Sequence, residues 1–115
     1  MSIVNKYIPY GSQKISEEDI EAVVKVLRSK FLTQGPAVPA FEQNVAQKFR
    51  VKHAVAVNSA TSALHIACLA LGLGPGDWLW TVPNTFVASA NCARYCGAKV
   101  DFIDIDPYTW NLSTP

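Results

Sequence analysis

From residue 53 onward, short apolar runs of strand length alternate with longer segments of helical character. The strand-like runs are "HAVAV" (53–57), "DWLWTV" (77–82) and "AKVDFIDI" (98–105), and the helix-like segments are "ATSALHIACLAL" (60–71) and "TFVASANCARYC" (85–96). Strands that alternate with helices are joined by crossovers that place the strands parallel in one sheet. The alternation therefore predicts an α/β fold in which a βαβαβ unit forms a parallel sheet.

The segment before residue 53 predicts two helices joined by a loop. Ser16 and Asp19 have the spacing of a capping box. The helix that they begin carries an apolar stripe at positions i, i+3, i+4 and i+7, made of Ile20, Val23, Val24 and Leu27. Glycine and proline interrupt this pattern in "FLTQGPAVP" (31–39), which is typical of a loop. The next helix is expected to bury one edge, made of Val38, Phe41, Val45 and Phe49.

Composition limits both the size of the core and the class of partner. Half of the 115 residues are hydrophobic and only 17% are charged. A chain of this size buries only a modest core, so we expect an oligomer or further protein to cover the surplus. The net charge of +1 gives no basic footprint for nucleic acid. The apolar run "TSALHIACLALGL" (61–73) is too short to span a membrane. We predict a cytoplasmic protein that binds neither nucleic acid nor a membrane.

The three cysteines predict free thiols. Cys68, Cys92 and Cys96 cannot all pair with one another, which favours a reducing compartment. Cys92 and Cys96 are four residues apart and their spacing would allow a shared metal ion, but no histidine or carboxylate is suitably placed beside them. We therefore interpret both as small buried thiols and predict no metal site.

The stretch "NSATSALHIA" (58–67) follows the first predicted strand and begins the helix predicted after it. The first backbone N–H groups of a helix have no intrahelical partner, and the helix dipole favours an anion there. Ala60 leaves the backbone approachable, while Thr61 and Ser62 add hydroxyl donors. An ordinary serine or threonine N-cap explains the same residues equally well. The residues alone leave a phosphate site and a plain cap as even alternatives.

Three other features have simpler interpretations. "GLGPGD" (72–77) follows a helix and precedes a strand, so Gly72 is predicted to end that helix rather than to bind a phosphate. Phe86 follows the next strand and either packs in the core, which the residues alone favour, or lies as a flat plate in a ligand crevice. "DIDP" (104–107) predicts a strand end followed by a turn. The helix over 60–71 is apolar nearly all round, which predicts burial on more than one side.

Residues 8–42, 54–77 and 81–112 together resemble the N-terminal third of the DegT/DnrJ/EryC1/StrS nucleotide-sugar aminotransferases, which depend on pyridoxal phosphate. The motifs that carry the resemblance are "LTQGP", "NSATSALH", "TFVASAN" and "CGAKVDFIDID". The resemblance implies the N-terminal portion of the fold-type I, aspartate aminotransferase-like large domain. Residues 1–52 would then form a helical segment with a substrate loop, and residues 53–115 the first, incomplete part of the pyridoxal-phosphate-binding domain.

The resemblance also implies a reaction. It points to the branch of the family that transfers an amino group, with glutamate as the expected donor, to the C4 keto group of a UDP-linked 4-keto-6-deoxy-N-acetylhexosamine in pseudaminic acid biosynthesis. The alternatives are an aminotransferase of the same family with another keto sugar, and a non-catalytic fragment that binds a sugar nucleotide or a partner chain. A homodimer with shared active sites is expected, which agrees with the apolar surplus.

Site residues follow from the resemblance position by position. The cofactor phosphate would be held by Ala60, Thr61 and Ser62, and Phe86 would stack on the pyridine ring, which reverses the preference for the core. The resemblance assigns sugar-nucleotide contacts to Tyr10, Lys30, Phe31, Leu32, Thr33 and Ala60.

One departure from the family pattern affects catalysis. The lysine that binds the cofactor as a Schiff base, and the aspartate that pairs with the pyridine nitrogen, are expected beyond residue 115, and none of the lysines present matches that position. The resemblance therefore assigns no catalytic residue within 1–115. We expect the 115 residues alone to be inactive and to represent part of an enzyme.

Overall fold

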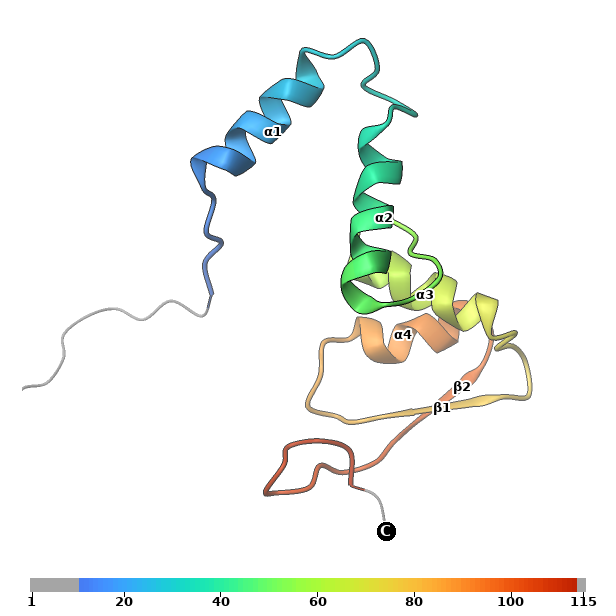
Figure 1. Ribbon diagram of the computed structural model, residues 1–115. Helices are drawn as coiled ribbons and strands as arrows, with labels where there is room; N and C mark the ends of the chain where they lie inside the picture. The colour runs from blue at the N-terminus through green and yellow to red at the C-terminus, as the bar shows by residue number, and fades with distance from the viewer. Residues whose placement is uncertain (1–10, 114–115) are drawn as a thin grey trace, which may run out of the picture. The chain divides into compact units, whose positions relative to one another are not determined.

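The computed structural model describes residues 11–113, which form two compact units divided between Ala56 and Val57. Tyr10, a predicted substrate contact, lies outside the described residues. Figure 1 shows the elements of the described chain, which are α1 (Glu17–Leu27), α2 (Ala37–Phe49), α3 (Ala60–Ala70), β1 (Trp78–Thr81), α4 (Ala88–Tyr95) and β2 (Lys99–Phe102).

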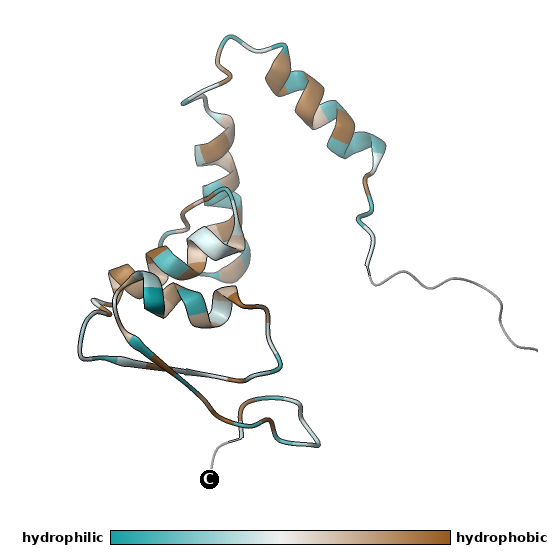
Figure 2. Ribbon diagram, turned by 180° about the vertical axis from the view of Figure 1, so that it is seen from behind, coloured by the Kyte–Doolittle hydropathy of each residue, from teal (hydrophilic) through white to brown (hydrophobic). Residues whose placement is uncertain are grey.

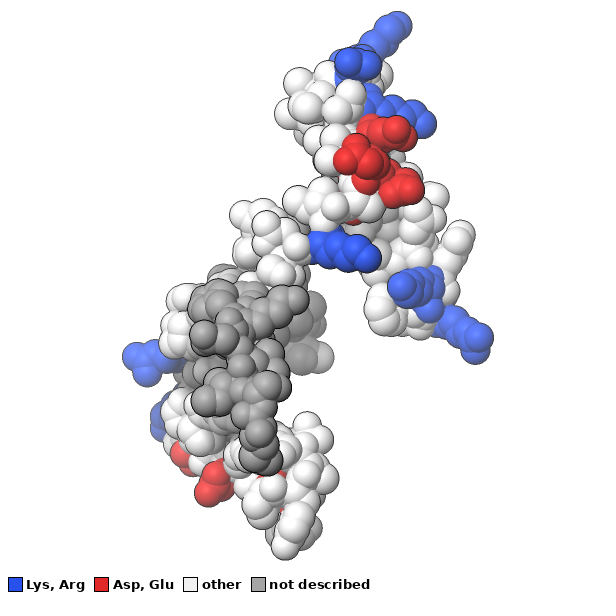
Figure 3. All heavy atoms as spheres, turned by 90° about the vertical axis from the view of Figure 1, so that its left-hand side faces the viewer, with Lys and Arg blue, Asp and Glu red and all other residues white. Residues whose placement is uncertain are grey.

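Helix α1 begins with the predicted capping box. The Ser16 hydroxyl oxygen accepts the backbone N–H of Asp19 at 3.3 Å, and the Asp19 carboxylate accepts the backbone N–H of Ser16 at 2.9 Å. Acidic side chains fill the first turn and Lys25 lies in the last turn, an order that the helix dipole favours. Figure 3 shows these acidic side chains gathered at one end of the helix. The helix is confirmed, and its start is fixed by hydrogen bonds within four residues.

Helix α2 begins earlier than the predicted loop allows. The loop was expected to reach Pro39, but the helix starts at Ala37 and includes that proline in its first turn. A proline is tolerated there because the first N–H groups of a helix have no intrahelical acceptor. The prediction of a loop over 31–39 is therefore wrong for its last three residues.

The apolar faces of both helices are exposed. Figure 2 shows apolar and polar residues interleaved along them. Ile20 of α1 is 46% exposed and Phe41 of α2 is 59% exposed. No residue of either helix is buried, and of the predicted α2 edge only Val45 is half-buried. The expectation of a buried edge is wrong because a helix face is buried only where another element packs on it, and no such packing occurs within residues 11–113.

The predicted first strand, "HAVAV" (53–57), is not a strand. Within this stretch the Ala56 backbone N–H donates to Glu42 Oε1 at 2.8 Å, a side-chain acceptor in the first unit and not a neighbouring strand. A strand requires a ladder with a neighbouring strand, and in the described part of the chain β1 and β2 pair only with each other. The strand prediction is therefore wrong, because no other strand of the described residues pairs with residues 53–57.

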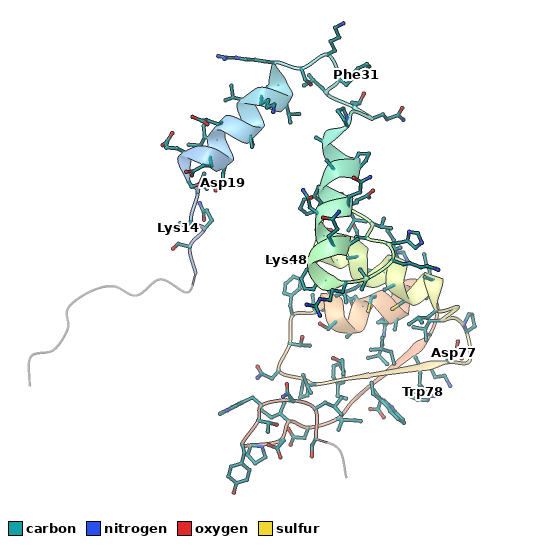
Figure 4. All side chains as sticks on the ribbon, in the orientation of Figure 1. Lys14, Asp19, Phe31, Lys48, Asp77 and Trp78 are labelled. Atoms are coloured by element: carbon teal, nitrogen blue, oxygen red, sulfur yellow. The ribbon has the colours of Figure 1, made fainter. Side chains whose placement is uncertain are left out.

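The second unit contains a β1–α4–β2 crossover with parallel strands. β1 and β2 pair in the register Trp78↔Lys99 through Thr81↔Phe102. The Lys99 ammonium lies 5.1 Å from the centroid of the Trp78 ring, whose position at the start of β1 is labelled in Figure 4. α4 packs against both strands, and α3 packs on α4 (Figure 1). The α/β class and the parallel pairing are confirmed.

The buried core lies around α4 and is made of small side chains. Its members are Cys68, Ala88, Ala90, Cys92, Ala93 and Ala98. His65 of α3 meets Tyr95 of α4 edge to face, with ring centroids 5.3 Å apart. Cys68 is the sole buried residue of α3, and Leu69 is 55% exposed. The expected burial of α3 on more than one side is wrong, because α3 packs on α4 within its unit and Cys68 alone of its residues is buried.

Two turns confirm their sequence predictions. Gly72 ends α3 with φ +74°, and the N–H groups of Gly72 and Leu73 donate to the carbonyls of Leu69 and Cys68 at 3.0 Å each. This is the Schellman arrangement, which favours glycine at the left-handed position. In "DIDP" the Asp106 carboxylate accepts the backbone N–H groups of the following turn, Tyr108 at 2.9 Å and Thr109 at 2.7 Å.

Candidate cofactor-phosphate site

The N-terminus of α3 is organised by a hydroxyl network. Ser59 is the N-cap, and its hydroxyl oxygen accepts the backbone N–H of Ser62 at 3.1 Å. The Ser62 hydroxyl donates to Asn58 Oδ1 at 2.7 Å, and the Ser59 and Ser62 hydroxyl oxygens lie 3.0 Å apart. The helix therefore has the plain cap that the sequence allowed. Neither Ser59 nor Asn58 was assigned a role from the sequence, although Ser59 stands at the preferred cap spacing before Ser62.

The cap leaves specific donors free at the same helix end. In residues 11–113, the backbone N–H groups of Ala60 and Thr61 and the Thr61 hydroxyl have no hydrogen-bond partner. These donors gather where the helix dipole is positive, which suits a phosphate group. The donor set fits the phosphate of pyridoxal phosphate. Ser62 differs from Ala60 and Thr61, because its N–H and its hydroxyl proton are already committed to the cap.

Phe86 lies outside the core. Its ring is 74% exposed, so the interpretation as a core residue is wrong. The backbone beneath it is fixed by the turn that leads into α4: the Phe86 carbonyl accepts the Ser89 N–H at 3.0 Å, and the Thr85 and Ser89 hydroxyl oxygens lie 2.9 Å apart. The result is an exposed aromatic ring on an ordered turn.

The second unit places both cofactor candidates at one edge. α3 and α4 begin on the side where β1 and β2 end, as Figure 1 shows. Ala60, Thr61 and Ser62 therefore lie on the same edge of the unit as the loop with Phe86. This is the carboxyl edge of a parallel sheet, the usual place for ligands in α/β proteins.

The predicted substrate residues Lys30, Phe31, Leu32 and Thr33 belong to the first unit, in the loop between α1 and α2. All four are exposed. The Ser29 hydroxyl donates to the Phe31 carbonyl at 3.1 Å, which folds the loop on itself. Gly35 packs so closely that an added Cβ would lie 2.9 Å from the Phe31 carbonyl oxygen. The loop thus presents its side chains outward from a backbone that requires glycine.

Neither a cluster of metal-ligating side chains nor a membrane-spanning helix occurs among the described residues. No group of three histidine, cysteine, aspartate or glutamate side chains within 11–113 is arranged to hold a metal ion. Over the same residues, no helix combines the length and the apolar character needed to cross a membrane.

Comparison with known proteins finds sugar aminotransferases among the proteins that this chain is similar to. The family model described as the DegT/DnrJ/EryC1/StrS aminotransferase family matches residues 13–115. The chain is 44% identical over 108 residues to the spore coat polysaccharide biosynthesis protein SpsC of Bacillus subtilis (strain 168), covering 94% of this chain and 28% of the relative. It is 49% identical over 98 residues to the UDP-4-amino-4,6-dideoxy-N-acetyl-beta-L-altrosamine transaminase of Campylobacter jejuni, covering 85% of this chain and 26% of the relative.

Solved structures agree with the sequence relatives. The putative sugar aminotransferase Spr1654 from Streptococcus pneumoniae, known in PLP and PMP forms, matches with a TM-score of 0.85 and 32% identity, covering 92% of this chain and 27% of that protein. 3-Amino-5-hydroxybenzoic acid synthase matches with a TM-score of 0.79 and 29% identity, covering 87% of this chain and 27% of that protein. The chain spans about a quarter of the length of the relatives it matches.

Proposed function

Because the chain belongs to the DegT/DnrJ/EryC1/StrS aminotransferase family, we propose that it forms the cofactor-phosphate end of a pyridoxal-phosphate-dependent sugar-nucleotide aminotransferase. The observation that carries the proposal is the start of α3, where the N–H groups of Ala60 and Thr61 are free and aligned with the helix dipole. Residues 1–52 contribute the substrate loop and residues 53–115 the first part of the cofactor domain.

The residues of this chain would bind and orient the cofactor. The N–H groups of Ala60 and Thr61 would donate to its phosphate and the exposed Phe86 ring would stack on the pyridine, while Ser62 holds the shape of the helix entrance. Bound pyridoxal phosphate supplies an electron sink for the carbon that loses or gains the amino group. We place the lysine that binds the cofactor and the aspartate that pairs with its ring nitrogen beyond residue 115.

We further propose that glutamate supplies the amino group and that the acceptor is the C4 keto group of a UDP-linked 4-keto-6-deoxy-N-acetylhexosamine, as in the route to pseudaminic acid. The 49% identity to the altrosamine transaminase of Campylobacter jejuni supports this substrate. Tyr10, Ala60 and the loop residues Lys30, Phe31, Leu32 and Thr33 would contact the sugar nucleotide. The protein would act in the cytoplasm as a homodimer with shared sites, which accords with its exposed apolar side chains.

A second candidate is an aminotransferase of the same family that acts on another keto sugar. It is supported by 39% identity over 102 residues to the UDP-4-amino-4-deoxy-L-arabinose–oxoglutarate aminotransferase of Shewanella sediminis. The two candidates differ in the keto sugar that accepts the amino group. A panel of UDP-linked keto sugars separates them.

The test of the proposed function is an amino-transfer assay with the protein read through from this chain into the following coding sequence. With pyridoxal phosphate and ¹⁵N-glutamate, the UDP-4-keto-6-deoxy sugar should become a ¹⁵N-labelled 4-amino sugar that mass spectrometry detects. A Thr61→Val variant keeps the side-chain volume but loses the hydroxyl donor, and should bind pyridoxal phosphate more weakly while its affinity for pyridoxal stays unchanged. Equal affinities of Thr61→Val and wild type for pyridoxal phosphate, or no labelled product from any keto sugar, would overturn the proposal.

A further inference from the structure

Three thiols gather where α3 packs on α4. Cys68 of α3 is 7% exposed and Cys92 of α4 is 2% exposed, while Cys96 at the C-terminal end of α4 is half-buried. Cys92 and Cys96 are four residues apart and therefore lie on the same face of α4, the face that meets Cys68. The cofactor and substrate residues do not include any of them.

The thiols are close enough to influence one another. Burial raises the pKa of the Cys68 thiol to about 11, and the neighbouring Cys92 and Cys96 thiols add to the rise. Apart from Cys68 and Cys92, the buried side chains of the described residues are alanines.

We propose that Cys68 and Cys96 form a reversible disulfide that fastens α3 to α4 when a small-molecule disulfide oxidises the protein. The half-buried position of Cys96 allows it to meet the oxidant, whereas Cys92 is enclosed and its thiol donates to the Ser89 carbonyl at 3.3 Å. The described residues offer no three-ligand metal site here, so the thiols are not assigned to a metal.

Geometry disfavours the pair of cysteines that lies within α4. Side chains four residues apart on one helix have Cβ atoms about 5–6 Å apart, but a disulfide prefers a Cβ separation of about 3.8 Å. A Cys92–Cys96 bond is therefore disfavoured while α4 is intact. Cys68 comes from a separate helix and can approach Cys96 without bending α4.

The chemistry is two successive thiol–disulfide exchanges. The Cys96 thiolate attacks oxidised glutathione, forming a mixed disulfide and releasing one glutathione thiolate; the Cys68 thiolate then attacks the Cys96 sulfur and releases the second. Two protein thiols lose two protons and two electrons in total, and one glutathione disulfide becomes two glutathione molecules. The bond joins α3, which begins with Ala60–Ser62, to α4, which begins after Phe86.

Trypsin separates the outcomes cleanly. Cleavage after Arg94 and Lys99 releases Cys96 in the short peptide YCGAK (95–99), while Cys68 and Cys92 stay together in the peptide 53–94. After native protein is treated with oxidised glutathione, alkylated and digested without reduction, we expect these two peptides to be joined. The link should persist in Cys92→Ala and be lost in Cys68→Ala, with helix content checked by circular dichroism.

Oxidation of the unfolded protein in denaturing urea, followed by the same alkylation and digestion, is the positive control. There the Cys68→Ala variant should regain a link through Cys92, because unfolding removes the restraint that α4 imposes. In native protein, three results would overturn the proposal: unlinked YCGAK that carries glutathione, a link that survives in Cys68→Ala, or a link that disappears in Cys92→Ala.

Discussion

Replacing Ser59 with alanine removes the acceptor that caps α3. The hydrogen bond lost joins the Ser62 N–H to the Ser59 hydroxyl oxygen at 3.1 Å, and the hydroxyl contact between these serines at 3.0 Å is lost with it. Ser59 is exposed, so water replaces the missing acceptor and no buried group is stranded. The expected loss in the free energy of unfolding is therefore about 1 kcal/mol, the typical value for an N-cap. For a unit of this size that lowers the melting temperature by about 4–8 °C.

The Ser59→Asp variant tests phosphate binding at the start of α3 separately from helix capping. Aspartate caps helices as well as serine does, so stability should stay within a few tenths of a kcal/mol of the wild type. Its carboxylate, however, would lie beside the free N–H groups of Ala60 and Thr61 and repel a phosphate. At a partly exposed site this repulsion should weaken pyridoxal phosphate binding roughly tenfold and leave pyridoxal binding unchanged.

Urea unfolding followed by circular dichroism measures the first effect, and equilibrium dialysis of the two ligands measures the second. Unchanged stability of Ser59→Ala would refute the cap argument. Unchanged pyridoxal phosphate affinity of Ser59→Asp would refute the placement of the phosphate at the start of α3.

Three further predictions concern backbone and charge. Gly35→Ala places a Cβ 2.9 Å from the Phe31 carbonyl oxygen, so the loop should shift at a cost of about 1–3 kcal/mol and UDP should bind more weakly by calorimetry. Gly72→Ala meets open space, but its φ of +74° disfavours a side chain, so the urea midpoint should fall by an amount equivalent to about 1 kcal/mol. The backbone N–H groups of Thr109 and then Tyr108 donate to the Asp106 carboxylate and hold its pKa below its ordinary value. The turn is therefore stabilised at pH values above the ordinary carboxyl pKa, and it loses that stabilisation as the pH falls through the lowered pKa. The Thr109 amide resonance should follow this transition in an NMR titration, and Asp106→Asn should abolish it.

Features fixed by neighbours in sequence could be predicted. The box formed by Ser16 and Asp19 and the glycine end of α3 at Gly72 depend on hydrogen bonds that span five residues or fewer. Their residue types have strong steric or hydrogen-bonding reasons to occupy those positions. The boundary of α2 was missed because a proline in a first turn resembles a proline in a loop.

Features that need a distant partner could not be predicted. "HAVAV" (53–57) has the composition of a strand, but composition does not say which strand lies beside it. Val38 and Phe41 have helical spacing, yet the spacing only states that one face is apolar and not that anything covers it. Phe86 is the clearest case, since the same residue type serves a core and an exposed ring, and only the 74% exposure decides between them.

The candidate site depends more on hydrogen bonds between neighbours in sequence than on contacts with distant residues. The donors at the start of α3 are set by Asn58, Ser59 and Ser62 within five residues, and Phe86 is held by the turn that ends at Ser89. The thin core of alanines and thiols contributes only the packing that brings the two helix starts to one edge. Substitutions in the cap should therefore alter phosphate affinity locally, whereas substitutions on the exposed face of α3, such as Leu69→Ser, should leave the cap unchanged and act only on whatever surface covers that face.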